Sequence, residues 1–168
     1  MQIEYCTSGK HIDKITYSHF DTTFGLVLTA WHEDMLCFLA FTRHCGIESV
    51  IVHIQKLFPK AQLIYSENHY DIFTNPPKAL LLVGTPFQHR VWRALSELRS
   101  GEIITYAELA TRAGVPRAIR ATASAVGANP ISYFIPCHRI LPASGGAGRY
   151  HWGDDIKLNL LNTEGYLP

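Results

Sequence analysis

Apolar residues in the first half of the chain come in three short runs that are rich in β-branched and aromatic side chains. The polar stretches 21–25 and 32–34 separate these runs and carry turn-forming residues. Short runs bounded in this way predict an antiparallel meander of three strands. The predicted strands cover residues 14–20, 26–31 and 35–41.

Apolar residues at helical spacing replace this pattern in residues 46–57, and Pro59 ends the predicted helix. Residues 62–65 predict one more strand, and the extended apolar stretch 78–83 leads into the second half of the chain. A sheet with one covering helix is an α+β arrangement. We therefore expect two domains, residues 1–80 and residues 81–168.

Two capping boxes mark the start of helices in the second half. Thr85 is followed by Pro86 at the first helical position and by Gln88 three residues after the threonine, and Thr105 is followed by Glu108. In such a box the threonine and the later Gln or Glu satisfy each other's free backbone amides. The helices that they predict cover residues 86–99 and 105–113.

A third helix is predicted over residues 117–128, after Gly114 ends the second one. A helix, a turn with glycine and a helix form the outline of a helix-turn-helix. The third helix is rich in alanine, and Arg117 and Arg120 are its only charged residues. Small side chains allow close approach to a nucleic acid, but they also suit a helix packed tightly on a neighbour. A last short helix is predicted over residues 157–161.

The charge of the whole chain gives no sign of a nucleic-acid partner, but one stretch of the second half does. The 168 residues carry a net charge of +1, with 47% hydrophobic and 17% charged residues, which is enough apolar material for a packed core. The stretch from Arg90 to Arg149, however, contains eight arginines and three glutamates, which gives it a local charge of +5. Arginine suits phosphate recognition, although a solvated surface is the plain alternative.

The four cysteines do not form a disulfide framework or a zinc-finger spacing. Cys37 lies in an apolar run and is expected to be a small core residue. The sequence shows no secretion signal and no membrane-spanning run, so we expect a soluble, cytoplasmic protein without membrane contact. Six histidines scattered through the first half, none expected to be a ligand, are His11, His19, His32, His44, His53 and His69.

One polar cluster lies in an apolar setting in the second half. Pro136, Cys137, His138 and Arg139 are preceded and followed by large apolar residues. Burying such a cluster is costly unless its members satisfy one another, so it is either a reactive site or an accident of core packing. A thiol beside a potential base is the composition that nucleophilic catalysis requires.

The sequence resembles the O6-alkylguanine-DNA alkyltransferases, also called methylated-DNA–protein-cysteine methyltransferases. Five motifs carry the resemblance in order: Thr-Tyr-x-x-Leu-Ala from Thr105, Asn129-Pro130, the Pro-Cys-His-Arg box, the Gly-rich loop 145–153, and Leu-Leu-x-x-Glu-Gly ending at Gly165. The resemblance implies an N-terminal ribonuclease H-like antiparallel sheet with a covering helix. It implies a mostly helical, winged-helix-like C-terminal domain with a helix-turn-helix.

The resemblance also implies an activity. An alkyl group on O6 of guanine, and less readily on O4 of thymine, is transferred irreversibly to Cys137 after the damaged base is flipped out of double-stranded DNA. Each molecule would act once, as a monomer and without a cofactor. His138 would accept the thiol proton, directly or through water, and Glu164 would orient His138. Asn129 would brace the turn, and Tyr106 would help to protonate the leaving guanine.

The DNA contacts implied by the resemblance centre on the third helix. Arg120 would fill the vacated position in the base stack, from the minor groove. The other expected DNA-binding residues are Arg117, Ala121, Ser124 and Thr105. The base pocket is expected to contain Tyr150, His151 and Trp152. Many relatives carry small residues at the last two positions, so we predict a narrow pocket that reacts poorly with benzyl-sized adducts.

The same residues bear on metal binding and on two alternative functions. Some family members bind a structural zinc in the first half, but the cysteine spacing here does not fit, and we predict no zinc. A DNA-binding module that recognises lesions or regulates transcription without transfer would keep the helix-turn-helix and would not need Cys137. A cysteine hydrolase is a third possibility, with no oxyanion-loop signature to support it.

Overall fold

The computed structural model describes residues 1–67 and 71–166, so His69 lies outside the described residues. The chain forms two compact units, Met1–Gly84 and Thr85–Pro168. The division comes four residues later than the expected boundary after residue 80. The reason is that the strand Ala79–Val83 is hydrogen-bonded within the sheet of the first unit.

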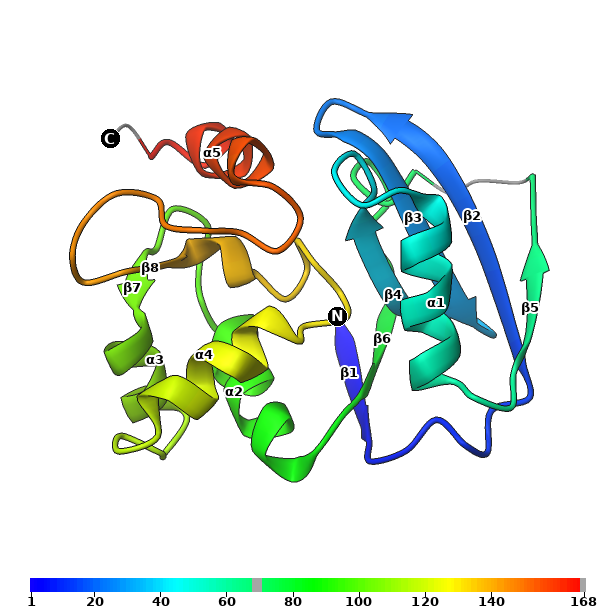
Figure 1. The fold of residues 1–168 in the computed structure, drawn as a ribbon, viewed down its shortest axis with the longest axis horizontal. Coiled ribbons are helices and arrows are strands. Elements are labelled where there is room, and N and C mark those ends of the chain that lie inside the picture. Colours follow the sequence, from blue (N-terminus) through cyan, green and yellow to red (C-terminus); the bar gives the residue numbers. More distant parts are fainter. Residues whose placement is uncertain (68–70, 167–168) are drawn as a thin grey trace. The chain divides into compact units, whose positions relative to one another are not determined.

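The first unit is a six-stranded sheet with one helix (Figure 1). Its strands lie in the order β1-β6-β4-β3-β2-β5. The predicted meander is confirmed, because β3 pairs antiparallel with both β2 and β4. The elements are β1 (Gln2–Cys6), β2 (Lys14–Thr22), β3 (Gly25–His32), β4 (Met35–Phe41), α1 (Ile47–Leu57), β5 (Gln62–Tyr65) and β6 (Ala79–Val83).

The sheet as a whole is mixed, not antiparallel as expected. β6 runs parallel to β1 and β4, and β5 runs parallel to β2. A parallel neighbour requires a crossover connection, and the segment containing α1 supplies it between β4 and the later strands. β1 was not predicted, since its five residues include only a few apolar side chains and it lies at the edge of the sheet.

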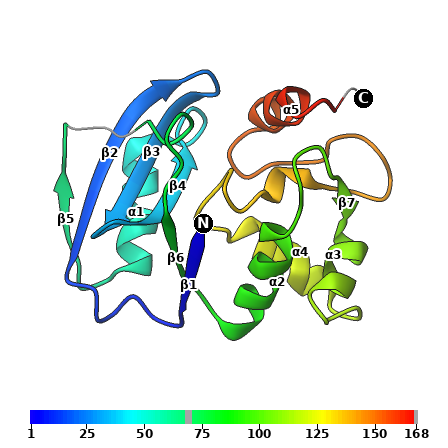
Figure 2. The ribbon, with the colours of Figure 1, turned by 180° about the vertical axis from the view of Figure 1, so that it is seen from behind.

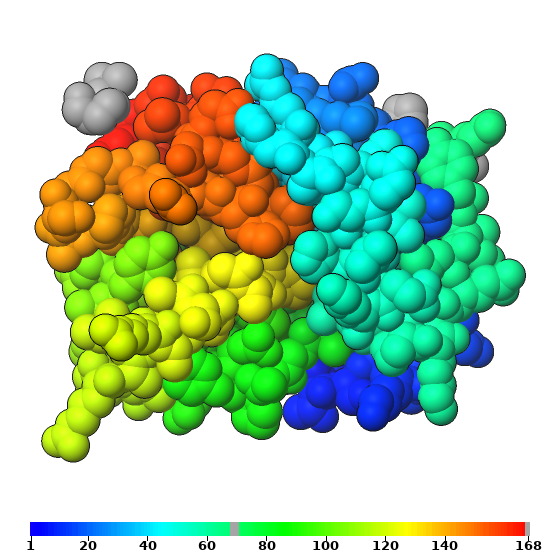
Figure 3. Space-filling model, in the orientation of Figure 1, coloured from blue at the N-terminus to red at the C-terminus, as the bar shows by residue number. Residues whose placement is uncertain are grey.

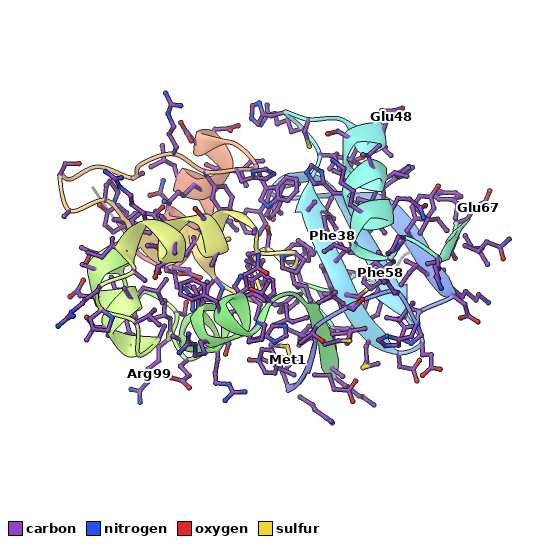
Figure 4. All side chains as sticks on the ribbon, turned by 60° about the horizontal axis from the view of Figure 1, so that its bottom comes forward. Met1, Phe38, Glu48, Phe58, Glu67 and Arg99 are labelled. Atoms are coloured by element: carbon purple, nitrogen blue, oxygen red, sulfur yellow. The ribbon has the colours of Figure 1, made fainter. Side chains whose placement is uncertain are left out.

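Helix α1 covers one face of the sheet, in front of it in Figure 1 and behind it in Figure 2. Val50 and Ile54 on the helix are fully buried, as the helical spacing predicted. Figure 4 shows Phe38 and Phe58 within this unit, where both are buried, and Glu48 and Glu67 pointing outward. The apolar core of the unit therefore lies between the helix and the strands.

The second unit is mostly helical. Both predicted capping boxes are confirmed: Thr85 accepts from the backbone amide of Gln88, and Thr105 accepts from that of Glu108. The elements are α2 (Pro86–Ser96), β7 (Ile104–Thr105), α3 (Tyr106–Arg112), α4 (Ile119–Gly127), the 3₁₀ turn η1 (Cys137–Arg139), β8 (Ile140–Leu141) and α5 (Asp154–Thr163). The two-residue strands β7 and β8 pair in parallel. They are too short for sequence patterns to reveal.

The helix-turn-helix outline is present as α3 and α4, which pack on each other and on α2. Gly114, with a φ of 72°, makes the turn after α3. Trp92 of α2 is 1% exposed, and its Nε1 donates a hydrogen bond to the carbonyl oxygen of Ala125 at 2.8 Å. This bond fixes α4 on α2, so the opposite side of α4 is left exposed.

Two helices start two or more residues away from their predicted starts, and α2 ends at Ser96, three residues before its predicted end. α4 begins at Ile119, not at 117, so Arg117 lies in the turn before the helix, and no side chain caps the helix start. α5 begins at Asp154, three residues before the predicted start, because two acidic residues in its first turn favour helix there. Within the described residues, no helix is both long enough and apolar enough to cross a bilayer.

Candidate active site

Cys137 begins the η1 turn and is 6% exposed. Asn129 holds the turn in place from the segment that follows α4. Its Nδ2 donates to the carbonyl oxygen of Ile135 at 2.7 Å and to Cys137 Sγ at 3.2 Å, and its Oδ1 accepts from the amide of Ile131 at 3.1 Å. The side chain of Asn129 therefore links both ends of the connecting loop to the thiol.

Tyr150 approaches the same sulfur from the loop before α5, with its hydroxyl 3.5 Å from Cys137 Sγ. Burial raises the pKa of the Cys137 thiol, while the hydrogen bonds from Tyr150 and Asn129 and the charge of Lys157 act to lower it. Burial also raises the pKa of Tyr150, and the sulfur raises it further. Tyr150 therefore stays a neutral hydroxyl that can donate to a thiolate.

His138 and Arg139 share Glu164 as their partner. His138 Nε2 lies 3.2 Å from Glu164 Oε1, and Arg139 contacts both carboxylate oxygens, at 2.9 Å from Nε and 2.6 Å from a terminal nitrogen. Arg139 also donates to the carbonyl oxygen of Leu98 at 2.7 Å. Although partial burial opposes ionisation, the hydrogen bonds from His138 and Arg139 lower the pKa of Glu164 to about 2. Glu164 is therefore a carboxylate at neutral pH.

The other ring nitrogen of His138 is a buried atom with no hydrogen-bond partner among the described residues. His138 is fully buried, and burial lowers its pKa. Tyr133 adopts a φ of 73°, which is unusual for a residue with a side chain, and its ring lies nearly parallel to that of His138 at a centroid distance of 6.4 Å. The described residues contain no direct hydrogen bond between His138 and Cys137.

Lys157 is a site residue that the sequence analysis missed. It is 1% exposed, and its ammonium donates to the carbonyl oxygen of Ile140 at 2.7 Å. Burial lowers its pKa to about 8, and the nearby Cys137 opposes that shift. The signal was available in the sequence, because Lys157 stands three and four residues before the apolar Leu160 and Leu161 and so lies on the buried face of α5.

Cys137, Asn129, Tyr150 and Lys157 line a cavity of about 70 Å³ within the second unit. Figure 3 shows the surface hollowed between α4, in yellow, and the loop before α5, in orange. Trp152 is 4% exposed and its ring packs edge-to-face on His151 at 4.4 Å. The cavity lining includes every predicted pocket residue, and its members are Tyr106, Ala123, Val126, Gly127, Asn129, Cys137, Arg149, Tyr150, His151, Trp152 and Lys157.

The residues predicted to bind DNA lie at or near α4. Arg120, Ala121 and Ser124 are exposed on the helix, and Arg117 is exposed just before it. Neither arginine forms an ion pair within the part of the chain that the structure describes. Thr105 lies apart from this group, and its hydroxyl is engaged in the capping box of α3, 2.8 Å from Glu108 Oε2.

The described residues contain no group of three or more His, Cys, Asp or Glu side chains placed to hold a metal ion. The expected absence of zinc stays a prediction that metal analysis of the purified protein can test. The fold and the site thus define a class of protein: one with an exposed helix-turn-helix beside a cavity that holds a single cysteine.

Comparison with known proteins identifies the class more closely. Residues 86–166 match the family described as 6-O-methylguanine DNA methyltransferase, DNA binding domain. The chain is 34% identical to the methylated-DNA–protein-cysteine methyltransferase of Haemophilus influenzae, over 88% of this chain and 85% of that protein. The corresponding protein of Methanosarcina acetivorans is also 34% identical, over 89% of this chain and 97% of its own length.

Comparison with solved structures points to the same family as the sequence relatives. The O6-methylguanine methyltransferase of Mycobacterium tuberculosis superimposes with a TM-score of 0.73 at 30% identity, covering 89% of this chain and 92% of that one. The structure of the same protein in complex with DNA gives 0.68 at 28% identity, with the same coverage. The chain belongs to the methylated-DNA–protein-cysteine methyltransferase family. It spans about half the length of two of its curated relatives, the Ada proteins of Salmonella typhimurium and Escherichia coli.

Proposed function

We propose that this protein repairs alkylated DNA by transferring the alkyl group from O6 of guanine, and less well from O4 of thymine, to Cys137. The transfer is irreversible, uses no cofactor and occurs once per molecule. The observation that carries the proposal is the position of the Cys137 thiol. It lies in a cavity, in contact with Asn129 and Tyr150, next to a histidine whose carboxylate partner is held ionised by an arginine.

The proton of Cys137 moves first. Glu164 is ionised, so His138 Nε2 carries the hydrogen that it donates to Glu164, and the unpartnered Nδ1 is left with a lone pair. A buried acceptor without a partner is costly, and one water molecule between Nδ1 and the thiol would satisfy it. Through that water the proton passes from sulfur to His138. Glu164 stabilises the imidazolium that results.

The thiolate then attacks the alkyl carbon. A sulfur–carbon bond forms as the bond between that carbon and O6 breaks, and its electron pair stays with the guanine. Tyr106 lines the cavity as the first residue of α3 and donates a proton to the departing base. Lys157 lies at the same cavity, and its positive charge favours the thiolate before attack.

DNA is held by the helix-turn-helix from the minor groove. Arg120 enters the base stack where the damaged base has left it. Arg117, which lies just before α4, contacts the phosphate backbone of the DNA. Ala121 and Ser124 present small side chains that allow the backbone of α4 to approach the DNA closely. Flipping costs a few kcal/mol and costs less for a mispaired lesion, which favours damaged over intact sites.

We also propose the finer fold assignments. The three-stranded meander with parallel neighbours and one covering helix supports a ribonuclease H-like first domain. The helices α2 to α4 with the small β7–β8 sheet support a winged-helix-like second domain. The protein acts as a monomer in the cytoplasm.

Intact-mass measurement before and after exposure to a duplex with one O6-methylguanine tests the proposal. The expected result is a gain of one methyl group per chain, located by peptide mapping to Cys137 and absent in Cys137→Ala. Methylation of another cysteine, or of none, would contradict the proposal. If the duplex is bound with no mass gain, the lesion-binding module without transfer becomes the correct function.

A further inference from the structure

Ile119 is exposed at the start of the DNA-facing helix. It is the first residue of α4, and its side chain is 44% exposed. Among the described residues of the second unit, the large apolar side chains of comparable exposure are Ile119 and Leu158 of α5. Neither core packing nor helix propensity explains an isoleucine at this position. Its side chain is exposed, and isoleucine is a poorer helix former than alanine.

The helix geometry relates Ile119 to the cavity. Ile119 and Ala123 are four residues apart in α4 and therefore lie on the same face, one turn apart. Ala123 lines the cavity that contains Cys137. Side chains in a helix lean toward its N-terminus, so Ile119 extends this face outward from the cavity. Arg120 follows directly and is exposed on the adjoining side of the helix.

We propose that Ile119 is an apolar wedge that packs in the minor groove of duplex DNA beside Arg120 and holds the base pairs apart at the flipped nucleotide. This inference rests on the proposed function and adds a residue to it. Minor-groove proteins that kink DNA commonly insert an apolar side chain such as isoleucine between neighbouring bases. The sugar edges of the groove offer an apolar surface, and Ile119 gains burial there that it lacks in the free protein.

The wedge matters only when a duplex must be opened. Single-stranded DNA presents its bases without pairing, so a residue that keeps a duplex open has little to contribute to it. Arg120, by contrast, carries a charge that attracts either form of DNA. A comparison of duplex with single-stranded substrate therefore separates the wedge from general DNA binding and from the chemistry at Cys137.

Transfer rates of the Ile119→Ala and Ile119→Leu variants test the inference, with Leu158→Ala as a matched control on α5. Each protein is mixed in single-turnover experiments with one O6-methylguanine oligonucleotide, either single-stranded or paired. We expect Ile119→Ala to slow transfer from the duplex about tenfold, while single-stranded transfer stays within about twofold. Ile119→Leu and Leu158→Ala should stay within about twofold of the unmodified protein on both substrates.

The outcomes separate the two proposals. Equal rates of Ile119→Ala and the unmodified protein on the duplex overturn the wedge and leave the transfer activity standing. An equal loss on both substrates also overturns the wedge, because it indicates damage to the site itself. No transfer by the unmodified protein, even from the single strand, contradicts the proposed function.

Discussion

The two units bury polar side chains of different kinds. Among the described residues of the first unit, the buried polar side chains are hydroxyls with local partners: Ser18 pairs with Thr29 at 3.3 Å, and Thr42 donates to the carbonyl oxygen of Leu26 at 3.1 Å. The second unit buries the hydroxyls of Thr122 and Ser132, but it also buries an amide, an imidazole and an ammonium group, in Asn129, His138 and Lys157. Such polar and titratable groups are costly to bury, so finding them together in one unit supports the proposed position of the chemistry.

Two buried cysteines show the same contrast. Cys37 donates to the carbonyl oxygen of Ala30 at 3.2 Å, and burial raises its pKa far above the ordinary range, so it stays a thiol. Cys137 is also buried, but Asn129 directs an amide donor toward its sulfur, and the Tyr150 hydroxyl and the Lys157 charge are close by. Depth of burial therefore does not decide reactivity. Under the proposed function, the donors around the sulfur make the difference.

The largest expected effect on transfer comes from exchanging each buried cysteine for alanine. The two variants should differ in opposite ways in methyl transfer and in stability. Cys137→Ala should abolish methyl transfer and change the free energy of unfolding little. Cys37→Ala should retain transfer and lower the free energy of unfolding by about 1 kcal/mol, because it opens a small gap in the core. Transfer assays with methylated duplex and denaturant titrations measure both. If Cys137→Ala still transferred the methyl group, Cys137 would not be the acceptor and would not differ from Cys37 in reactivity.

Glu164→Gln should have the next largest effect. The change leaves Arg139 half-buried without its carboxylate and removes the group that orients His138. We expect transfer to slow by about 100-fold and the free energy of unfolding at pH 7 to fall by about 3 kcal/mol. The exposed carboxylate of Glu67 in the first unit provides the control, and Glu67→Gln should change neither quantity.

The pH dependence of stability gives a separate measurement of Glu164. Its pKa in the folded protein is lowered from 4.5 to about 2. Stability from its ionisation is therefore complete above about pH 5 and is lost as the pH falls from about 4.5 toward 2. The stability of Glu164→Gln, measured by urea unfolding across this range, should fall less steeply with acid. Parallel curves for the two proteins would show that the carboxylate is not held by Arg139.

Sequence patterns predicted the helices and strands that local rules define. The capping boxes at Thr85 and Thr105 and the meander of β2 to β4 are of this kind, since neighbouring residues determine them. The parallel pairing of β6 between β1 and β4 depends on residues more than 30 positions apart, and no local pattern encodes it.

The predicted site shows the same division. Motifs indicated Cys137, His138 and Glu164, and the structure brings the last two within 3.2 Å. Lys157 was missed because a lysine in an amphipathic helix is ordinarily solvated; its spacing to Leu160 and Leu161 places it on the buried face of α5, and the position of α5 beside η1 brings that face to the site. The bidentate contact of Arg139 with Glu164 likewise required the structure.

Lys157→Met should separate activity from stability. The ammonium is costly to bury, as its lowered pKa of about 8 indicates, while its bond to the carbonyl oxygen of Ile140 offsets part of that cost. The free energy of unfolding should therefore change by no more than about 1 kcal/mol. Transfer should slow about tenfold, since the thiolate loses a nearby positive charge. Lys56→Met on the exposed side of α1 is the control, and an equal loss of transfer there would contradict this role.

The smallest expected effect concerns the size of the adduct. The bulky Trp152 side chain is buried at the cavity that holds Cys137 and takes up space there, so the unmodified protein should react slowly with O6-benzylguanine. Trp152→Ala should raise the ratio of benzyl to methyl transfer about fivefold, and Trp152→Phe should raise it less. Competition between the two adducts in one reaction measures the ratio without depending on the fraction of folded protein. A ratio that does not respond to either change would show that another side chain limits the pocket.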